Sequence, residues 1–168
     1  MPLFQNLFGR VGSMLSTLTP STYFLITFTI ALFLHFIFPI YLSDLITVNL
    51  LQAIGIILLL IALTFNTLAF RAFKAHATPH DPFSQASSLI TTGIFKLSRN
   101  PVYLALILVE FAFGFIVDSG WFIGTSIVLF ILLNHFIIPN EEKMLEESFE
   151  KEYREYKGRV GRWVRLSS

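Results

Sequence analysis

The chain has 168 residues, enough for one domain, and 54% of them are hydrophobic against 14% charged. Its 19 phenylalanines and mean hydropathy of +0.68 indicate more apolar surface than a water-soluble protein of this size can bury. The absence of cysteine excludes disulfides, thiolate metal sites and a cysteine nucleophile, and the net charge of +1 says little as a total. We therefore expect an all-α, polytopic membrane protein whose main partner is the lipid bilayer.

The N-terminal 20 residues lack the uninterrupted apolar core and the small-residue cleavage site of a signal peptide. Their apolar residues recur instead at helical spacing, beginning with Leu3, Phe4, Leu7 and Phe8. Residues 1–20 are therefore predicted to form an amphipathic segment. It would lie along the inner membrane surface or pack under the helix bundle.

Four apolar runs predict four transmembrane helices, at residues 23–42, 48–70, 101–117 and 121–138. The first two reach the roughly 20 residues that a helix needs to cross the hydrocarbon core, and the last two are at the short end of the range. Glu110 interrupts the third run.

The placement of charge gives the expected topology. All twelve Lys and Arg lie in the N-terminal segment, the 71–100 connection or the tail from residue 139, and the connections around Asp44 and Asp118 contain none. The positive-inside rule then places both termini and the 71–100 connection in the cytoplasm.

The cytoplasmic loop 71–100 contains Pro79, Pro82 and Gly93, which prevent one continuous helix. Its length and aromatic content predict a segment folded against the membrane face. His76 and His80 are four residues apart, but the proline between them breaks the helix that would align them, so we predict no metal site. The sequence contains no nucleotide-binding glycine motif, and its basic residues are too evenly mixed with acids for nucleic-acid binding.

The tail 139–168 is predicted to form a cytoplasmic helix from about Glu141 to Lys157, stopped by Gly158. Pro139 would end the fourth span and Asn140 would cap the new helix. The helix has one apolar stripe, formed by Leu145, Phe149, Tyr153, Tyr156 and Val160. Its expected i,i+4 ion pairs are Glu147–Lys151, Glu150–Arg154 and Glu155–Arg159. Trp163, flanked by Arg159, Arg162 and Arg165, suits the headgroup region.

Two polar groups flank the last two spans, and each has a structural explanation. In Arg99-Asn100-Pro101-Val102-Tyr103, Asn is a good N-cap, Pro suits the first helical position and Tyr suits the interface. Glu141 and Glu142 suit the first turn of a helix. His135, inside the fourth span, is in a place where a lone histidine is more often a hydrogen-bonded core residue than a ligand or base. From the residues alone, structural and functional roles both remain open.

Glu110 is different, because an ionisable side chain within a span is costly and faces the bundle or a wet cavity. We predict that it lines a pocket for substrate. His35 in the first span is ambiguous, and donating a hydrogen bond to a neighbouring helix would explain it.

Taken together, "TTGIFKLSRNPVYLALIL" and the later "NHFIIPNEEKMLEESFEKEYREYKGRVGRWV" resemble the isoprenylcysteine carboxyl methyltransferase and phospholipid methyltransferase group. The resemblance covers residues 78–164, and its motifs are Arg-His/Asn-Pro-x-Tyr at one helix start and Glu-Glu after the next helix. It implies a bacterial-type, inner-membrane methyltransferase that uses S-adenosylmethionine at the cytoplasmic helix ends, covered by the C-terminal segment. The expected acceptor is a small lipophilic molecule, an isoprenylcysteine-like carboxylate or a lipid amine.

The resemblance also implies roles for individual residues. Arg99 and Glu142 would be catalytic. The expected cofactor-binding residues are Asn100, Pro101, Tyr103, Ala105, His135, Glu141 and Glu142. Ala105 stands where the family often has Gly, and Asn140 stands where it often has Arg.

Two alternatives remain. One is a sterol-reductase-like membrane enzyme that binds NADPH, although its Lys-Tyr-Gly signature and cysteine are absent from this chain. The other is a non-catalytic four-helix scaffold, in which Arg99, Glu110 and Glu142 would not converge on one cavity.

Overall fold

The computed structural model describes residues 18–44, 46–76 and 88–164 of the chain, and the regular structure in this part is entirely helical. In chain order the elements are α2 (Pro20–Ile37), α3 (Val48–Ala75), the 3₁₀ turn η1 (Gly93–Lys96), α4 (Pro101–Ile116), α5 (Gly120–Leu132), the π-helical turn η2 (Leu133–Ile137) and α6 (Ile138–Arg159). The predicted all-α class is confirmed for these residues. The amphipathic segment predicted for residues 1–20 lies outside them except at its last residues.

Three helices are long and apolar enough to cross a membrane: α2, α3 and the continuous helix from Gly120 to Arg159. Helix α4 is apolar but has 16 residues, or about 24 Å, which is less than the roughly 30 Å hydrocarbon core. Large apolar side chains such as Phe33, Ile57 and Val128 are exposed on the outer faces of the bundle. This surface is one that lipid covers, so the chain is a membrane protein.

Two predicted boundaries are wrong by about one turn or more. Helix α2 ends at Ile37 rather than residue 42, because Phe38 precedes Pro39 and the residue before a proline disfavours the helical conformation. Helix α3 runs to Ala75, past the predicted end at Phe70, so the polar end of the helix extends beyond its apolar part.

The prediction that Pro139 ends the last span is also wrong. The helix continues from α5 through the π turn η2 into α6, and Pro139 occupies the first turn of α6. A proline inside a regular α-helix clashes with a preceding carbonyl, and the wider π turn just before it relieves that clash. Asn140 therefore does not cap a new helix; its amide donates to the Phe136 carbonyl at 2.9 Å.

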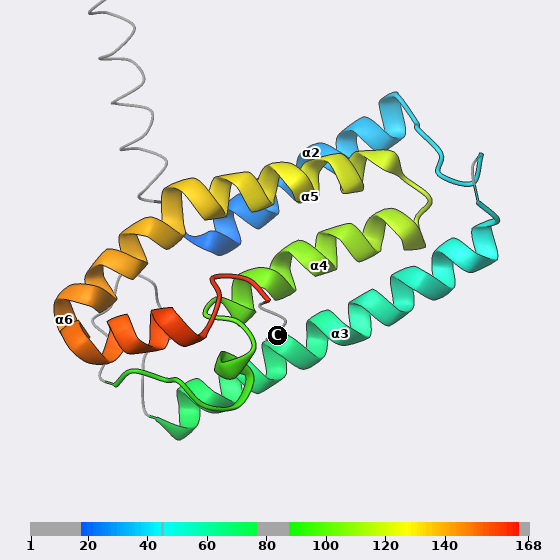
Figure 1. Cartoon of the computed structure of the whole chain (residues 1–168). Coiled ribbons are helices and arrows are strands. Elements are labelled where there is room, and N and C mark those ends of the chain that lie inside the picture. The colour runs from blue at the N-terminus through cyan, green and yellow to red at the C-terminus, as the bar shows by residue number, and fades with distance from the viewer. Residues whose placement is uncertain (1–17, 45, 77–87, 165–168) are drawn as a thin grey trace, which may run out of the picture.

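Helix α6 bends sharply at Glu150, whose φ of 34° and ψ of −104° are not helical. The second half turns back toward the start of α4 (Figure 1). None of the three predicted ion pairs is present in the described part of the chain. The bend explains the first two, because it separates Glu147 from Lys151 and lies at Glu150 itself, but it does not explain the absence of Glu155–Arg159. The pairs observed are Lys143–Glu147, Lys151–Glu155 and Lys157–Glu146.

The predicted apolar stripe on α6 is confirmed. Tyr153, Tyr156 and Val160 form a buried cluster with residues of the η1 segment and with Ala69 of α3. The Tyr156 hydroxyl donates to the Phe95 carbonyl at 2.7 Å, fixing η1 under α6. Residues 88–100 are therefore folded against the helix ends, residues 71–75 belong to α3, and residues 77–87 of the predicted loop lie outside the described residues.

Helix α4 packs most closely on α3, and α5 packs on both α2 and α4 (Figure 1). The α3–α4 contact is close because α3 presents small residues at seven-residue intervals: Gly55, Ala62 and Ala69. A Cβ added at Gly55 would lie 2.7 Å from Ile116 Cγ1 and 2.8 Å from the Ala112 carbonyl oxygen. This position requires glycine.

At the end of the bundle far from α6, Asp118 ties the two helix connections together. It accepts hydrogen bonds from the amides of Leu42 and Ser43, both at 2.8 Å, and from the Ser43 hydroxyl. Burial opposes ionisation, but these hydrogen bonds prevail and lower the pKa of the Asp118 carboxyl. His35 lies at the same end with its ring edge-on to Tyr41, and its Nδ1 has no hydrogen-bond partner among the described residues.

Candidate functional site

The two polar motifs predicted to form a site meet at the N-terminal end of α4. Arg99, just before α4, places Nη2 3.0 Å from Oε1 of Glu142 on α6, and both side chains are about nine-tenths buried. Its Nη1 donates to the Tyr153 hydroxyl at 3.0 Å. The bend in α6 produces this arrangement, because it brings Tyr153 back over the helix that carries Glu142. Burial raises the pKa of Tyr153 to about 12, so the hydroxyl stays protonated.

Glu142 is held by a second guanidinium, that of Arg162 in the C-terminal segment. Arg162 donates to both carboxylate oxygens, from Nη2 to Oε2 at 2.6 Å and from Nε to Oε1 at 3.1 Å. This two-point contact raises the pKa of Arg162. One carboxylate thus lies between two cations, a charge cluster that a protein needs either for structure or for a ligand.

The π turn η2 anchors the C-terminal segment. The Asn134 side-chain oxygen accepts from Nη1 of Arg162 at 3.1 Å and from the indole N–H of Trp163 at 3.2 Å. The Trp163 ring also packs on Phe130, with ring centroids 4.9 Å apart. A π turn leaves backbone groups exposed that a regular α-helix would hydrogen-bond within itself. Such turns recur at functional sites for this reason.

The start of α4 holds the same segment from the other side. The backbone N–H of Arg99 donates to the Gly161 carbonyl at 3.0 Å. The Ser98 hydroxyl and the side-chain amide of Asn100 donate to the Arg162 carbonyl at 3.2 and 3.0 Å. Asn100 occupies the N-cap position, but its side chain does not bond the helix amides as an N-cap would. We call residues 160–164 the C-terminal strap, because they cross from α6 to α4 over this cluster.

Glu141 points toward α4 and accepts a short hydrogen bond from the Tyr103 hydroxyl. Burial raises the pKa of Glu141 to about 7, further raised by the neighbouring charge of Glu142 and opposed by the Tyr103 hydrogen bond. The other carboxylate oxygen of Glu141 has no partner among the described residues. The adjacent acids therefore differ: Glu142 is saturated by cations, and Glu141 titrates near neutral pH.

Three other predicted site residues lie elsewhere. His135 is exposed on the outer side of η2 and bonds its own helix, with Nδ1 2.9 Å from the Ile131 carbonyl, so the structure does not bring it to the cluster. Ala105 is buried seven residues before Ala112, and therefore lies on the face of α4 that contacts α3. Glu110 is buried two turns below Tyr103 and is not part of the charge cluster. Pro101 is buried at the first position of α4, as expected.

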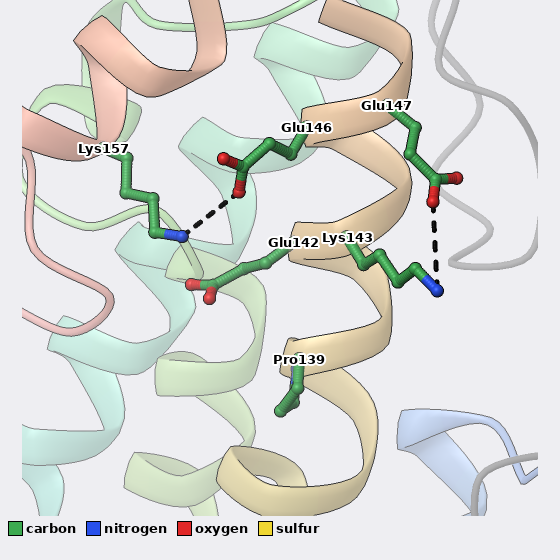
Figure 2. Close-up of a pocket in the computed structure, with 6 residues that line it drawn as sticks. All are labelled: Pro139, Glu142, Lys143, Glu146, Glu147 and Lys157. Atoms are coloured by element: carbon green, nitrogen blue, oxygen red, sulfur yellow. Dashed lines mark hydrogen bonds and ion pairs between the residues drawn. The ribbon is translucent and has the colours of Figure 1, made fainter. Parts of the chain in front are cut away.

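A cleft of about 300 Å³ opens beside Glu142. Figure 2 shows Glu142 reaching toward it from α6, with the Lys157–Glu146 pair above and Pro139 one turn below. This volume is at the lower end for small-molecule sites. Arg99, which pairs with Glu142 but does not itself line the cleft, keeps a buried Nε without a hydrogen-bond partner among the described residues. The site thus offers a buried donor, a free carboxylate oxygen and an adjoining space.

Sequence reasoning missed Tyr153, Asn134 and Arg162 as members of this cluster. Tyr153 and Arg162 were assigned to an apolar stripe and to the headgroup region, and Asn134 was given no role. The signal that could have identified Arg162 is the excess of acids at the start of α6, which requires a cation from outside that helix. Nothing in the spacing indicated the bend that brings these residues together.

Comparisons with known proteins give one family. The sequence model of a family described as phospholipid methyltransferase matches residues 50–152, which include nearly all of α3, the whole of α4 and α5, and most of α6. An uncharacterized protein of Haemophilus influenzae (strain ATCC 51907 / DSM 11121 / KW20 / Rd) is 38% identical over 63 residues, which is 38% of this chain and the whole length of the relative. No solved structure matches.

Proposed function

Since the chain belongs to the phospholipid methyltransferase family, we propose that it transfers a methyl group from S-adenosylmethionine to a small lipophilic acceptor. The acceptor would be a lipid amine or an isoprenylcysteine-like carboxylate. The observation that carries the proposal is the convergence of Arg99, just before α4, and Glu142 of α6, which meet at 3.0 Å within the matched region. Of the three residues whose convergence would count against a non-catalytic scaffold, Arg99 and Glu142 meet, and Glu110 lies apart from them.

We further propose that all four long helices, α4 included, cross the membrane. In a bacterium this would be the inner membrane. Arg99, Lys143 and the basic C-terminal segment lie at one end of the bundle, and the connection containing Asp118 lies at the other. The positive-inside rule then places the charge cluster and both termini in the cytoplasm, where S-adenosylmethionine is available.

The residues present fit this cofactor. The unpaired Nε of Arg99 is a buried donor suited to the carboxylate of the cofactor's amino-acid moiety. The free oxygen of Glu141 is an acceptor suited to an amine or a ribose hydroxyl. The cleft beside Glu142 provides adjoining space. Asn100, Pro101 and Tyr103 would shape the wall on the α4 side.

The cofactor supplies a methyl group already activated on a sulfonium, so the protein has to align the reactants and exclude water. Arg99 and Glu141 would bind and orient polar groups from opposite sides. Tyr103, hydrogen-bonded to Glu141, holds that carboxyl group in one orientation. The C-terminal strap, fixed by Asn134 and by the start of α4, would cover the site and keep water out.

The proposal is tested by incubating the purified chain with bacterial membrane lipids and S-adenosylmethionine carrying a tritiated methyl group. We expect label in the organic-soluble fraction, and less of it with Arg99→Lys. The sterol-reductase alternative predicts instead that the lipids cause oxidation of NADPH. Absence of extractable label, with NADPH oxidised, would overturn the proposal.

A further inference from the structure

The polar ends of the bundle lie closer together than the two faces of an ordinary hydrocarbon core. Helix α4, with 16 residues or about 24 Å, separates Arg99 at one end from Asp118 at the other. Asn134 of η2 follows Gly120, the first residue of α5, by 14 residues, or about 21 Å. Helix α2 has 18 residues, or about 27 Å. A typical hydrocarbon core is about 30 Å thick, so all three spans are short for it.

The two tryptophans lie at these same ends. The indole N–H of Trp121, at the start of α5, donates to the Phe38 carbonyl. The indole N–H of Trp163 donates to Asn134 at 3.2 Å. Tryptophan is enriched at both membrane–water interfaces. Trp121 and Asn134 are 13 residues apart, or about 20 Å along the helix, so the two indoles also indicate a thin apolar layer.

Helix α3 is long, but the surface that it presents to lipid has a similar dimension. The helix has 28 residues, and the exposed polar side chains of Gln52 and Thr67 lie toward its two ends. They are 15 residues apart, or about 22 Å. Large exposed side chains between them, such as Ile57 and Leu60, are apolar. The lipid-facing surface of α3 therefore matches the three shorter spans.

The polar ends are fixed, so they cannot adjust to a thicker bilayer. Long cationic side chains can snorkel to water, but Arg99 is held by Glu142 at 3.0 Å. Asp118 has a short side chain, and it is held by the amides of Leu42 and Ser43. The connection that carries these amides is not helical, and hydrocarbon cannot satisfy its backbone groups. Because tilting would shorten a span further, the bilayer has to adjust to the protein.

We propose that the chain is matched to a bilayer of short acyl chains, with a hydrocarbon core of about 24 Å, and that it thins a thicker bilayer around itself. The inference rests on the proposed crossing of the membrane by all four helices. It concerns the lipid that surrounds the chain, not the methyl acceptor. Thinning brings the head groups of the surrounding lipids to the level of the cluster formed by Arg99, Glu142 and Arg162.

The test reconstitutes the purified full chain in vesicles of four phosphatidylcholines and follows thermal unfolding by tryptophan fluorescence. The lipids are dimyristoleoyl-, dipalmitoleoyl-, dioleoyl- and dierucoyl-phosphatidylcholine, whose acyl chains lengthen in that order. Their common head group has no N–H, so it cannot accept a methyl group. We expect the highest melting temperature in one of the two shortest lipids, and a fall of at least about 5 °C from there to the dierucoyl lipid. A maximum in either longer lipid, or one melting temperature in all four, would overturn the inference.

A double variant, Gln52→Leu with Thr67→Leu, removes the two polar side chains toward the ends of the lipid-facing surface of α3. Both positions are exposed, so the buried contacts stay intact. The fall in melting temperature toward the dierucoyl lipid should become smaller by at least about 2 °C. The matched control is Thr29→Leu, an exposed position in the middle of α2, which should leave the fall unchanged. An unchanged fall in the double variant, or an equal change in the control, would contradict the inference.

Binding of S-adenosylhomocysteine is measured on the same vesicles. Its absence in all four lipids would count against the proposed function alone, because the melting profile involves no cofactor.

Discussion

Replacing Glu142 by Gln tests whether the charge cluster also holds the cytoplasmic end together. The wild-type carboxylate accepts from Arg99 at 3.0 Å and from two nitrogens of Arg162 at 2.6 and 3.1 Å. The glutamine would leave both guanidinium groups without their counter-ion. Breaking a buried ion pair by removing one partner costs about 3–5 kcal/mol. Because the Arg162 side chain is 30% exposed and can turn toward water, we expect the lower value, about 3 kcal/mol.

Each kcal/mol shifts the melting temperature of a chain of this size by about 2–4 °C, so Glu142→Gln should lower it by about 6–12 °C. The matched control is Glu147→Gln on the same helix. Its ion pair with Lys143 spans 3.9 Å between side chains that are 66% and 77% exposed. Such a pair contributes about 0–1 kcal/mol, so the control should shift the melting temperature by less than about 4 °C.

The assay is thermal unfolding followed by tryptophan fluorescence, in one detergent and at one ionic strength. Trp163 belongs to the strap that Arg162 anchors, so its signal reports the affected region. Equal shifts for Glu142→Gln and Glu147→Gln would refute the reasoning, because burial of the ion pair would then have no consequence for stability.

Three further substitutions test other parts of the structure by the same melting assay. The pKa of Glu141 is raised from 4.5 to about 7, so the stability it confers is complete below pH 4.5 and is lost as the pH rises through 7. Relative to Glu141→Gln, the wild type should therefore become less stable from pH 4.5 to 7, and a constant difference would contradict the buried placement of this carboxyl group. Gly55→Ala would place a methyl group 2.8 Å from a backbone carbonyl oxygen of α4 and should cost about 1–3 kcal/mol, whereas Gly124→Ala, which meets nothing within 4 Å, should not. Glu150→Gly should stabilise the chain by about 1 kcal/mol, because its φ of 34° disfavours any residue with a Cβ, whereas Glu152→Gly within the regular helix should destabilise it by a similar amount. Loss of stability in both Glu150→Gly and Glu152→Gly would argue against the bend at Glu150.

The helices were predictable because a helix surrounded by lipid needs a long run of apolar residues, and such runs are easily recognised in the sequence. The start of α4 at Pro101 was predicted to the residue, since proline at the first helical position is a local preference. The end of the last span was not predictable from the same rule. Pro139 is a helix breaker by propensity, and only the π turn at Leu133–Ile137 lets the helix pass through it.

The motif residues Arg99 and Glu142 were predictable as a pair because the family resemblance places them together, and the structure brings them into contact. Their partners were not, because Tyr153 and Arg162 reach Glu142 through a bend at a non-glycine residue. For His135 the family resemblance implies a place at the cofactor site, and the structure does not bring it to the charge cluster. It is only seven residues before Glu142, but the π turn and the helix phase put it on the outer surface.

The most direct test of cofactor use is calorimetric titration of S-adenosylhomocysteine into the purified chain in detergent, comparing the wild type with Arg99→Lys and Arg159→Lys. Lysine at 99 keeps the charge opposite Glu142 but removes the unpaired Nε, whereas Arg159 is exposed on α6 and serves as the matched control. We predict saturable binding of one ligand per chain in the wild type and in Arg159→Lys, and at least about tenfold weaker binding in Arg99→Lys. Absence of saturable binding in the wild type, or equal affinity in all three proteins, would contradict the account.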